Sequence, residues 1–140
     1  MKTNLYLLLL SALLFFSFSE ENSKKFEAKL VDIQYYSVNT CKSDSHIYVM
    51  VLYEVNYKNI ASLKMKHNFN ENITACSPVT ETDKKGNIVY GFCCSKEDNK
   101  SFITEFISPK GKVSNKVIVN IDFSVAEIIS GTPPQTIKSN

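Results

Sequence analysis

The sequence contains no arginine, because all 16 of its basic residues are lysine. Recognition of nucleic acids and phosphates depends heavily on the planar arginine side chain. The acidic residues number 14, so the formal net charge is only +2, and no basic stretch has aromatic residues interleaved. We therefore expect no nucleic-acid partner.

Residues and motifs that enzymes use are also scarce. The chain has two histidines and no tryptophan, and it lacks the nucleophile elbow, the zinc-protease motif and a glycine-rich phosphate loop. Neither His46 nor His67 stands at a metal-ligand spacing from a cysteine pair, and the adjacent Cys93-Cys94 is not a zinc knuckle. We predict a protein that is not an enzyme and that needs no metal or cofactor.

The N-terminus has the pattern of a secretory signal peptide. Lys2 precedes an apolar stretch from Leu5 to Phe16, which is shorter than the roughly 20 residues of a membrane-spanning helix. Small residues at Ser17 and Ser19 predict cleavage after Ser19, so residues 1–19 would be removed. We expect a secreted, extracellular protein without a membrane span in the mature chain; the alternative is an uncleaved anchor.

Alternating apolar residues predict strands, and no stretch shows sustained helical periodicity. The expected strands are 26–38, 47–57, 61–69, 72–82, 87–95, 101–107 and 116–125. The alternation changes phase at Leu30-Val31, which predicts a bulge or bend there. Seven short strands predict one all-β domain, an antiparallel β-sandwich over residues 20–128, followed by a flexible C-terminal tail over residues 129–140.

A hairpin signal joins two of these strands. The residues DKKG place Asp83 at the first and Gly86 at the fourth position of a type I turn. This turn would pair residues 72–82 with residues 87–95 as neighbouring antiparallel strands.

The stretch FISPKGKVSNKVIVNIDF, residues 106–123, resembles the last hairpin of immunoglobulin-like domains. The resemblance implies a seven-stranded immunoglobulin-like sandwich of the early-set or fibronectin-III-like kind. The buried tryptophan of antibody-type domains is absent, which departs from that subset.

Four cysteines behind a signal peptide predict two disulfides, since the secretory route is oxidising. The immunoglobulin-like strand order implies that Cys41, Cys76 and the Cys93-Cys94 pair meet at one end of one sheet. Two pairings remain open: the DKKG turn places Cys76 opposite Cys94, whereas hydrophobic patterning places Cys76 opposite Cys93. We favour patterning and predict Cys41–Cys94 with Cys76–Cys93.

Two triplets fit the acceptor pattern for N-linked glycans. They begin at Asn72 and Asn99, both in predicted turns, and neither has proline at its middle position. We predict a glycan on each.

Tyrosine is common at protein interfaces, and Tyr36 and Tyr48 stand on the less regular faces of their strands. We predict these two as exposed binding contacts.

These features favour a secreted binding module that recognises an extracellular protein or glycan in adhesion or signalling. The alternative is a small extracellular carrier that holds an apolar ligand between its sheets.

Overall fold

The computed structural model describes residues 25–38, 41–70 and 73–139 of the chain. The predicted signal peptide, residues 1–19, lies outside these residues. The described residues form ten strands and one short 3-10 helix, η1 (Ile60–Ser62), with no α-helix, so the predicted count of seven strands is wrong. The strands are β1 (Ala28–Ser37), β2 (His46–Val55), β3 (Lys64–Asn70), β4 (Ile73–Pro78), β5 (Glu81–Thr82), β6 (Ile88–Ser95), β7 (Lys100–Ile107), β8 (Val117–Ile121), β9 (Ile128–Ser130) and β10 (Ile137–Lys138).

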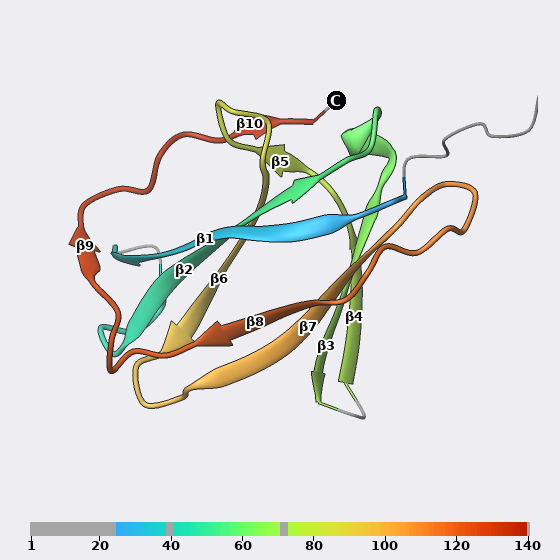
Figure 1. Cartoon of the computed structure of the whole chain (residues 1–140). Helices are drawn as coiled ribbons and strands as arrows, with labels where there is room; N and C mark the ends of the chain where they lie inside the picture. The colour runs from blue at the N-terminus through green and yellow to red at the C-terminus, as the bar shows by residue number, and fades with distance from the viewer. Residues whose placement is uncertain (1–24, 39–40, 71–72, 140) are drawn as a thin grey trace, which may run out of the picture.

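The strands form two sheets that lie face to face (Figure 1). The first sheet, called sheet A here, has the order β10-β5-β6-β2-β1-β9, and sheet B has the order β4-β3-β7-β8. All pairings are antiparallel except the one between β1 and β9. The prediction of an all-β, sandwich-like fold is therefore confirmed.

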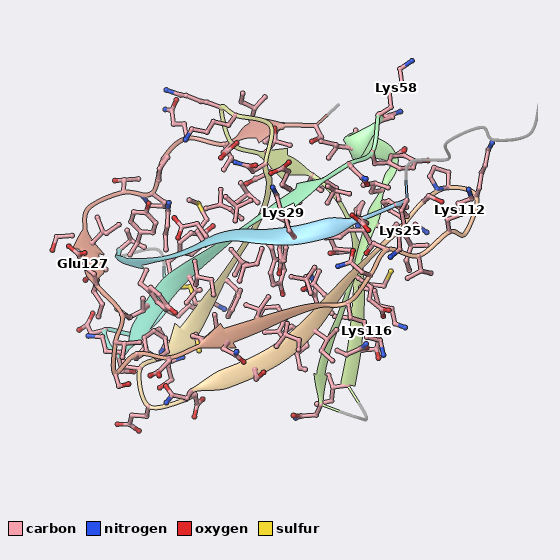
Figure 2. All side chains as sticks on the ribbon, viewed as in Figure 1. Lys25, Lys29, Lys58, Lys112, Lys116 and Glu127 are labelled. Atoms are coloured by element: carbon pink, nitrogen blue, oxygen red, sulfur yellow. A yellow bond between two sulfur atoms is a disulfide. The ribbon has the colours of Figure 1, made fainter. Side chains whose placement is uncertain are left out.

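The space between the sheets is filled by apolar side chains. Val49 and Val51 of β2 are completely buried on one side, and Phe106 of β7 is completely buried on the other. Figure 2 shows side chains throughout this space, whereas Lys58 and Glu127 point outward. The period-2 alternation of β2 and β7 produces this core directly, because every second side chain of a strand points to the same face.

Strand β1 carries the predicted bulge. Its register against β2 shifts between Leu30 and Asp32, and Val31 at the shift is 46% exposed. The extra residue lets the side chains on either side of it keep contact with the core although the sequence alternation changes phase.

The DKKG turn is confirmed, but the strand expected before it is not. The Gly86 amide donates to the carbonyl of Asp83, the Asp83 amide donates to the carbonyl of Asn87, and Gly86 has a positive φ of 86°. Strand β5 then pairs with β6 at one position, Thr82 with Ile88. Residues 73–78 belong to sheet B as β4 and pair with β3.

The reason for the split lies at residues 78–80, where the chain crosses from one sheet to the other. Pro78 ends β4 because it has no amide hydrogen for a sheet ladder. The amide of the next residue, Val79, donates to the carbonyl of Leu63, and the Val79 side chain is 3% exposed within the core. One predicted strand is therefore two strands in different sheets.

The C-terminal segment also differs from the flexible tail predicted for residues 129–140. Strand β9 pairs with β1 at one edge of sheet A, and β10 pairs with β5 at the opposite edge. The connection between them, residues 131–136, runs over the outer face of sheet A (Figure 1), and we call it the strap. On that face lies a second apolar cluster of Tyr36, Met50, Leu52 and Val89, each no more than 5% exposed.

Candidate functional site

A single disulfide joins the loop before β2 to the end of β6. It links Cys41 to Cys93, whose Cα atoms are 5.8 Å apart. Cys94, the predicted partner of Cys41, is 1% exposed and points into the core. Adjacent residues of a strand point to opposite faces, so only Cys93 can reach the outer side of sheet A where Cys41 lies. The predicted Cys41–Cys94 bond is therefore wrong.

The predicted Cys76–Cys93 bond is wrong as well, because the two residues lie in different sheets. Cys76 is on β4 of sheet B, where it pairs with Lys66. Among these four cysteines, all of which the structure describes, Cys76 is an exposed free thiol and Cys94 a buried one. Burial raises the pKa of the Cys94 thiol, which disfavours the reactive thiolate.

Neither predicted tyrosine contact is an exposed side chain. Tyr36 is 4% exposed in the outer apolar cluster of sheet A. Tyr48 is half-buried and lies across Gly91 of β6; a Cβ added to Gly91 would come within 1.8 Å of the Tyr48 hydroxyl. Because Gly91 has no side chain, the Tyr48 ring can lie over it. Tyr48 therefore packs on the sheet and does not project freely into solvent.

Asn99 is exposed in the turn between β6 and β7, where its Oδ1 accepts a hydrogen bond from the Phe123 amide, 3.3 Å away. The other predicted glycan acceptor, Asn72, lies outside the described residues. Asn70 and Ile73 lie close to it in sequence, and both line a groove of about 490 Å³ together with Asn99. Ile73 and Asn99 thus lie at the same end of the molecule.

A hydrogen-bonded chain crosses the core between the two sheets. Tyr53 Oη lies 2.8 Å from Thr104 Oγ1, which in turn lies 2.9 Å from His67 Nδ1. If Tyr53 donates to Thr104 and Thr104 donates to Nδ1, the proton of the neutral His67 ring is on Nε2; if the directions are reversed, Nδ1 carries it. His67 Nε2 is buried and has no partner among the described residues.

Five rings surround this end of the core. The His67 ring stacks on Tyr90 with a centroid separation of 4.0 Å, and Tyr90 lies 5.3 Å from Phe92. Phe69 and Phe102 complete the group, with centroids 5.1 Å apart. Tyr90, Phe92 and Phe69 are half-buried, so one side of the aromatic group faces solvent.

We call this side of the molecule the open side. It consists of two strand edges, β4 and the part of β6 from Val89 to Ser95, with the half-buried rings of Tyr90 and Phe92 between them. Strand β6 pairs with β2 along all eight of its residues but with β5 only at Ile88. Strand β4 pairs with β3 alone. In the described part of the chain, neither edge has a neighbouring strand along most of its length.

The open side presents backbone groups and aromatic rings. No cluster of three or more histidine, cysteine or acidic side chains that could hold a metal occurs among the described residues. The nearby ion pair on the outer face of sheet B, between Lys66 and Glu105 at 3.8 Å, is partly solvated. What the open side offers is unpaired backbone groups and aromatic rings. No helix in the described part of the chain has the length and apolar character needed to cross a membrane.

The sequence analysis did not identify the open side. The sequence feature that indicates this edge is the uncharged run from Val89 to Cys94, which has no lysine, acidic residue or proline. Natural edge strands usually carry such residues to prevent pairing with other chains. Because the sequence predicts residues 72–82 as one strand beside residues 87–95, it places this run between two strands and not at an edge.

Comparisons with known proteins found no match to this chain. No family model, no curated protein and no solved structure matches it.

Proposed function

We propose that the protein is a secreted, N-glycosylated binding module that recognises an extracellular partner through the open side. The observation that carries this proposal is the pair of unpaired, uncharged strand edges with half-buried aromatic rings between them. Aromatic side chains that are partly exposed beside free backbone groups are typical of recognition surfaces.

We further propose that the fold is immunoglobulin-like. The neighbours β5-β6-β2-β1 in one sheet, with β3-β7-β8 in the other, support an order in which the first, second and fifth strands of the immunoglobulin pattern share a sheet. Strand β4 beside β3, and β9 and β10 at the two edges of sheet A, are additions to that pattern.

Secretion is supported by the disulfide. A bond between Cys41 and Cys93 persists only where the surroundings are oxidising. The exposed side chain of Asn99, in a turn of the part of the chain that the structure describes, is accessible for attachment of a glycan.

The alternative is a carrier of an apolar ligand, and one observation favours it. His67 Nε2 lies unpartnered beside an aromatic group, where a hydrogen-bonding group on a ligand could meet it. The middle of the core gives this role less support, because Val49, Val51 and Phe106 are fully buried in one packed apolar cluster. Binding at the surface therefore fits the geometry better.

The test uses the mature, glycosylated protein as bait against extracellular material. We expect Ile73→Lys, on the open side, to lose the captured partner. Its matched control is Ile118→Lys, which makes the same change on β8, at the opposite edge of sheet B. Ile73 is 55% exposed and Ile118 62% exposed, so neither change requires the core to repack.

Two results would contradict the proposal. One is equal capture by both variants, which would place recognition elsewhere. The other is an apolar compound released when the purified protein is denatured and extracted with solvent, which would support the carrier.

A further inference from the structure

The free edge of β6 presents backbone groups at regular intervals. The Asn87 carbonyl accepts from the Asp83 amide, and its amide donates to the Asp83 carboxylate, so the backbone of Asn87 faces the side of β5. Backbone groups alternate in direction along an antiparallel strand. The amides and carbonyls of Val89, Gly91 and Cys93 therefore also face that side. Glu81, the first residue of β5, lies opposite Val89, so Gly91 and Cys93 are the positions that β5 does not reach.

Strand β4 extends beyond sheet A. Its pairing with β3 puts Ile73 and Ala75 on the side of the sheet that faces the core, because they alternate with Cys76, which shares the outer face with Lys66. Ile73 and Ala75 are nevertheless exposed, and the exposed fraction of Ile73 is 55%. Within the described residues, no strand of sheet A covers this part of β4 (Figure 1).

The opposite edge of sheet A is built differently. Strand β1 has a bulge between Leu30 and Asp32 and carries the charged side chains of Lys29 and Asp32, and β9 pairs with Tyr35 to Ser37. Bulges, charges and covering strands are the features that prevent strand edges from pairing with other chains. The open side has no charged side chain along Val89 to Cys94 or along β4, and its one irregularity among the described residues is the register shift of β3 at Asn68–Asn70, opposite the start of β4.

The composition of the two edges determines which partner suits them. In a two-fold arrangement, identical strands pair antiparallel, so each residue near the axis faces a copy of itself or of a near neighbour. A charged residue there would face its own charge, which is destabilising. Neither Ile73–Pro78 nor Val89–Cys94 contains a charged residue, and the whole chain has a formal net charge of only +2. Both edges are thus compatible with pairing to themselves.

We propose that the open side is covered by a second copy of this chain, in a two-fold dimer in which the edges of β4 and β6 meet their counterparts. Such a dimer continues the sheets across the axis, pairs the free backbone groups of Gly91 and Cys93, and removes Tyr90, Phe92 and Ile73 from solvent. The inference rests on the proposed function and names the partner as the protein itself, so binding would be homophilic.

The experiment measures the mass of the mature, glycosylated protein by sedimentation equilibrium over a range of concentrations. We expect the mass of two chains for the native protein and for Ile118→Lys, and the mass of one chain for Ile73→Lys. Lysine at position 73 keeps the acceptor triplet that begins at Asn72, because only proline is excluded at the middle position. Circular dichroism and thermal unfolding of both variants would establish that they fold alike.

An independent readout comes from Cys76, which is exposed on β4. A short bifunctional thiol reagent should cross-link the native protein to a covalent dimer, and Cys76→Ser should abolish the product. A native protein with the mass of one chain at every concentration would overturn the inference, and so would dissociation of both lysine variants. If that single-chain protein still captures another extracellular protein through Ile73, the proposed function stands and only self-association fails.

Discussion

The imidazole of His67 lies where its charged form is disfavoured. Burial lowers the pKa of His67 from 6.5 to about 4. Among the described residues, the neighbours of the ring are the Thr104 hydroxyl and the rings of Phe69, Tyr90 and Phe102. The His67 ring is therefore neutral in the folded protein, and it binds a proton more tightly in the unfolded chain.

This difference predicts a loss of stability in mild acid. Above pH 6.5 His67 is neutral in both the folded and the unfolded state, and its contribution to the free energy of unfolding is fully present. As the pH falls from 6.5 towards 4, only the unfolded chain gains the proton, so this contribution is lost. At pH 5 the free energy of unfolding should be lower by about 2 kcal/mol than at pH 8. Urea unfolding at the two pH values measures it.

A control variant separates His67 from other titrating groups. His67→Gln should show a smaller difference between pH 8 and pH 5 than the native protein does. An unchanged pH dependence in His67→Gln would show that some other group causes it.

At the scale of elements, the sequence predicted local geometry well and sheet membership poorly. Turn chemistry is local, so Asp83 and Gly86 predicted the turn, and the phase change at Leu30-Val31 predicted the bulge of β1. Alternation of apolar residues identifies a strand but does not specify its neighbour. Residues 72–82 show this: the turn correctly pairs Asp83 with Asn87, but the chain changes sheets four residues before it, at Val79.

The same limit applies at the C-terminus. The segment GTPPQTIKSN is polar and rich in proline and glycine, which favours an irregular chain. The position of this segment is determined by hydrogen bonds to residues that are distant in sequence. The Thr136 hydroxyl donates to the Glu81 carboxylate at 2.8 Å, and the Ser139 amide donates to the Thr80 carbonyl at 2.8 Å. No local pattern encodes such contacts.

The strap should therefore contribute to stability. A chain that ends after Ser130 would uncover the outer cluster formed by Tyr36, Met50, Leu52 and Val89. Exposure of roughly 100 Å² of apolar surface would lower the free energy of unfolding by about 2–3 kcal/mol. Urea unfolding and the fluorescence of a dye that binds apolar surfaces measure both effects. Val125→Ala is the control, because that side chain is 82% exposed. A truncated chain as stable as the native one would show that this segment behaves as a free tail.

At the scale of the whole molecule, the disulfide links parts of sheet A that are distant in sequence. Cys41 precedes β2 and Cys93 lies near the end of the neighbouring strand β6, 52 positions later. The closed loop contains β2, β3, β4, β5 and most of β6, so it spans both sheets. A link of this length restricts the unfolded chain strongly.

Removal of this bond should lower the free energy of unfolding by about 4 kcal/mol, the value that the chain-entropy model gives for a loop of this size. The double change Cys41→Ser with Cys93→Ser tests it by urea unfolding. Cys76→Ser is the control, since Cys76 is an exposed free thiol in the structure. If Cys76 were bonded to Cys93, as the sequence pattern suggested, Cys76→Ser would destabilise the protein to a similar extent. Non-reducing peptide mapping, with cleavage between Cys93 and Cys94, then decides the pairing directly: a peptide linked to Cys41 through Cys94 would contradict the structure at this position.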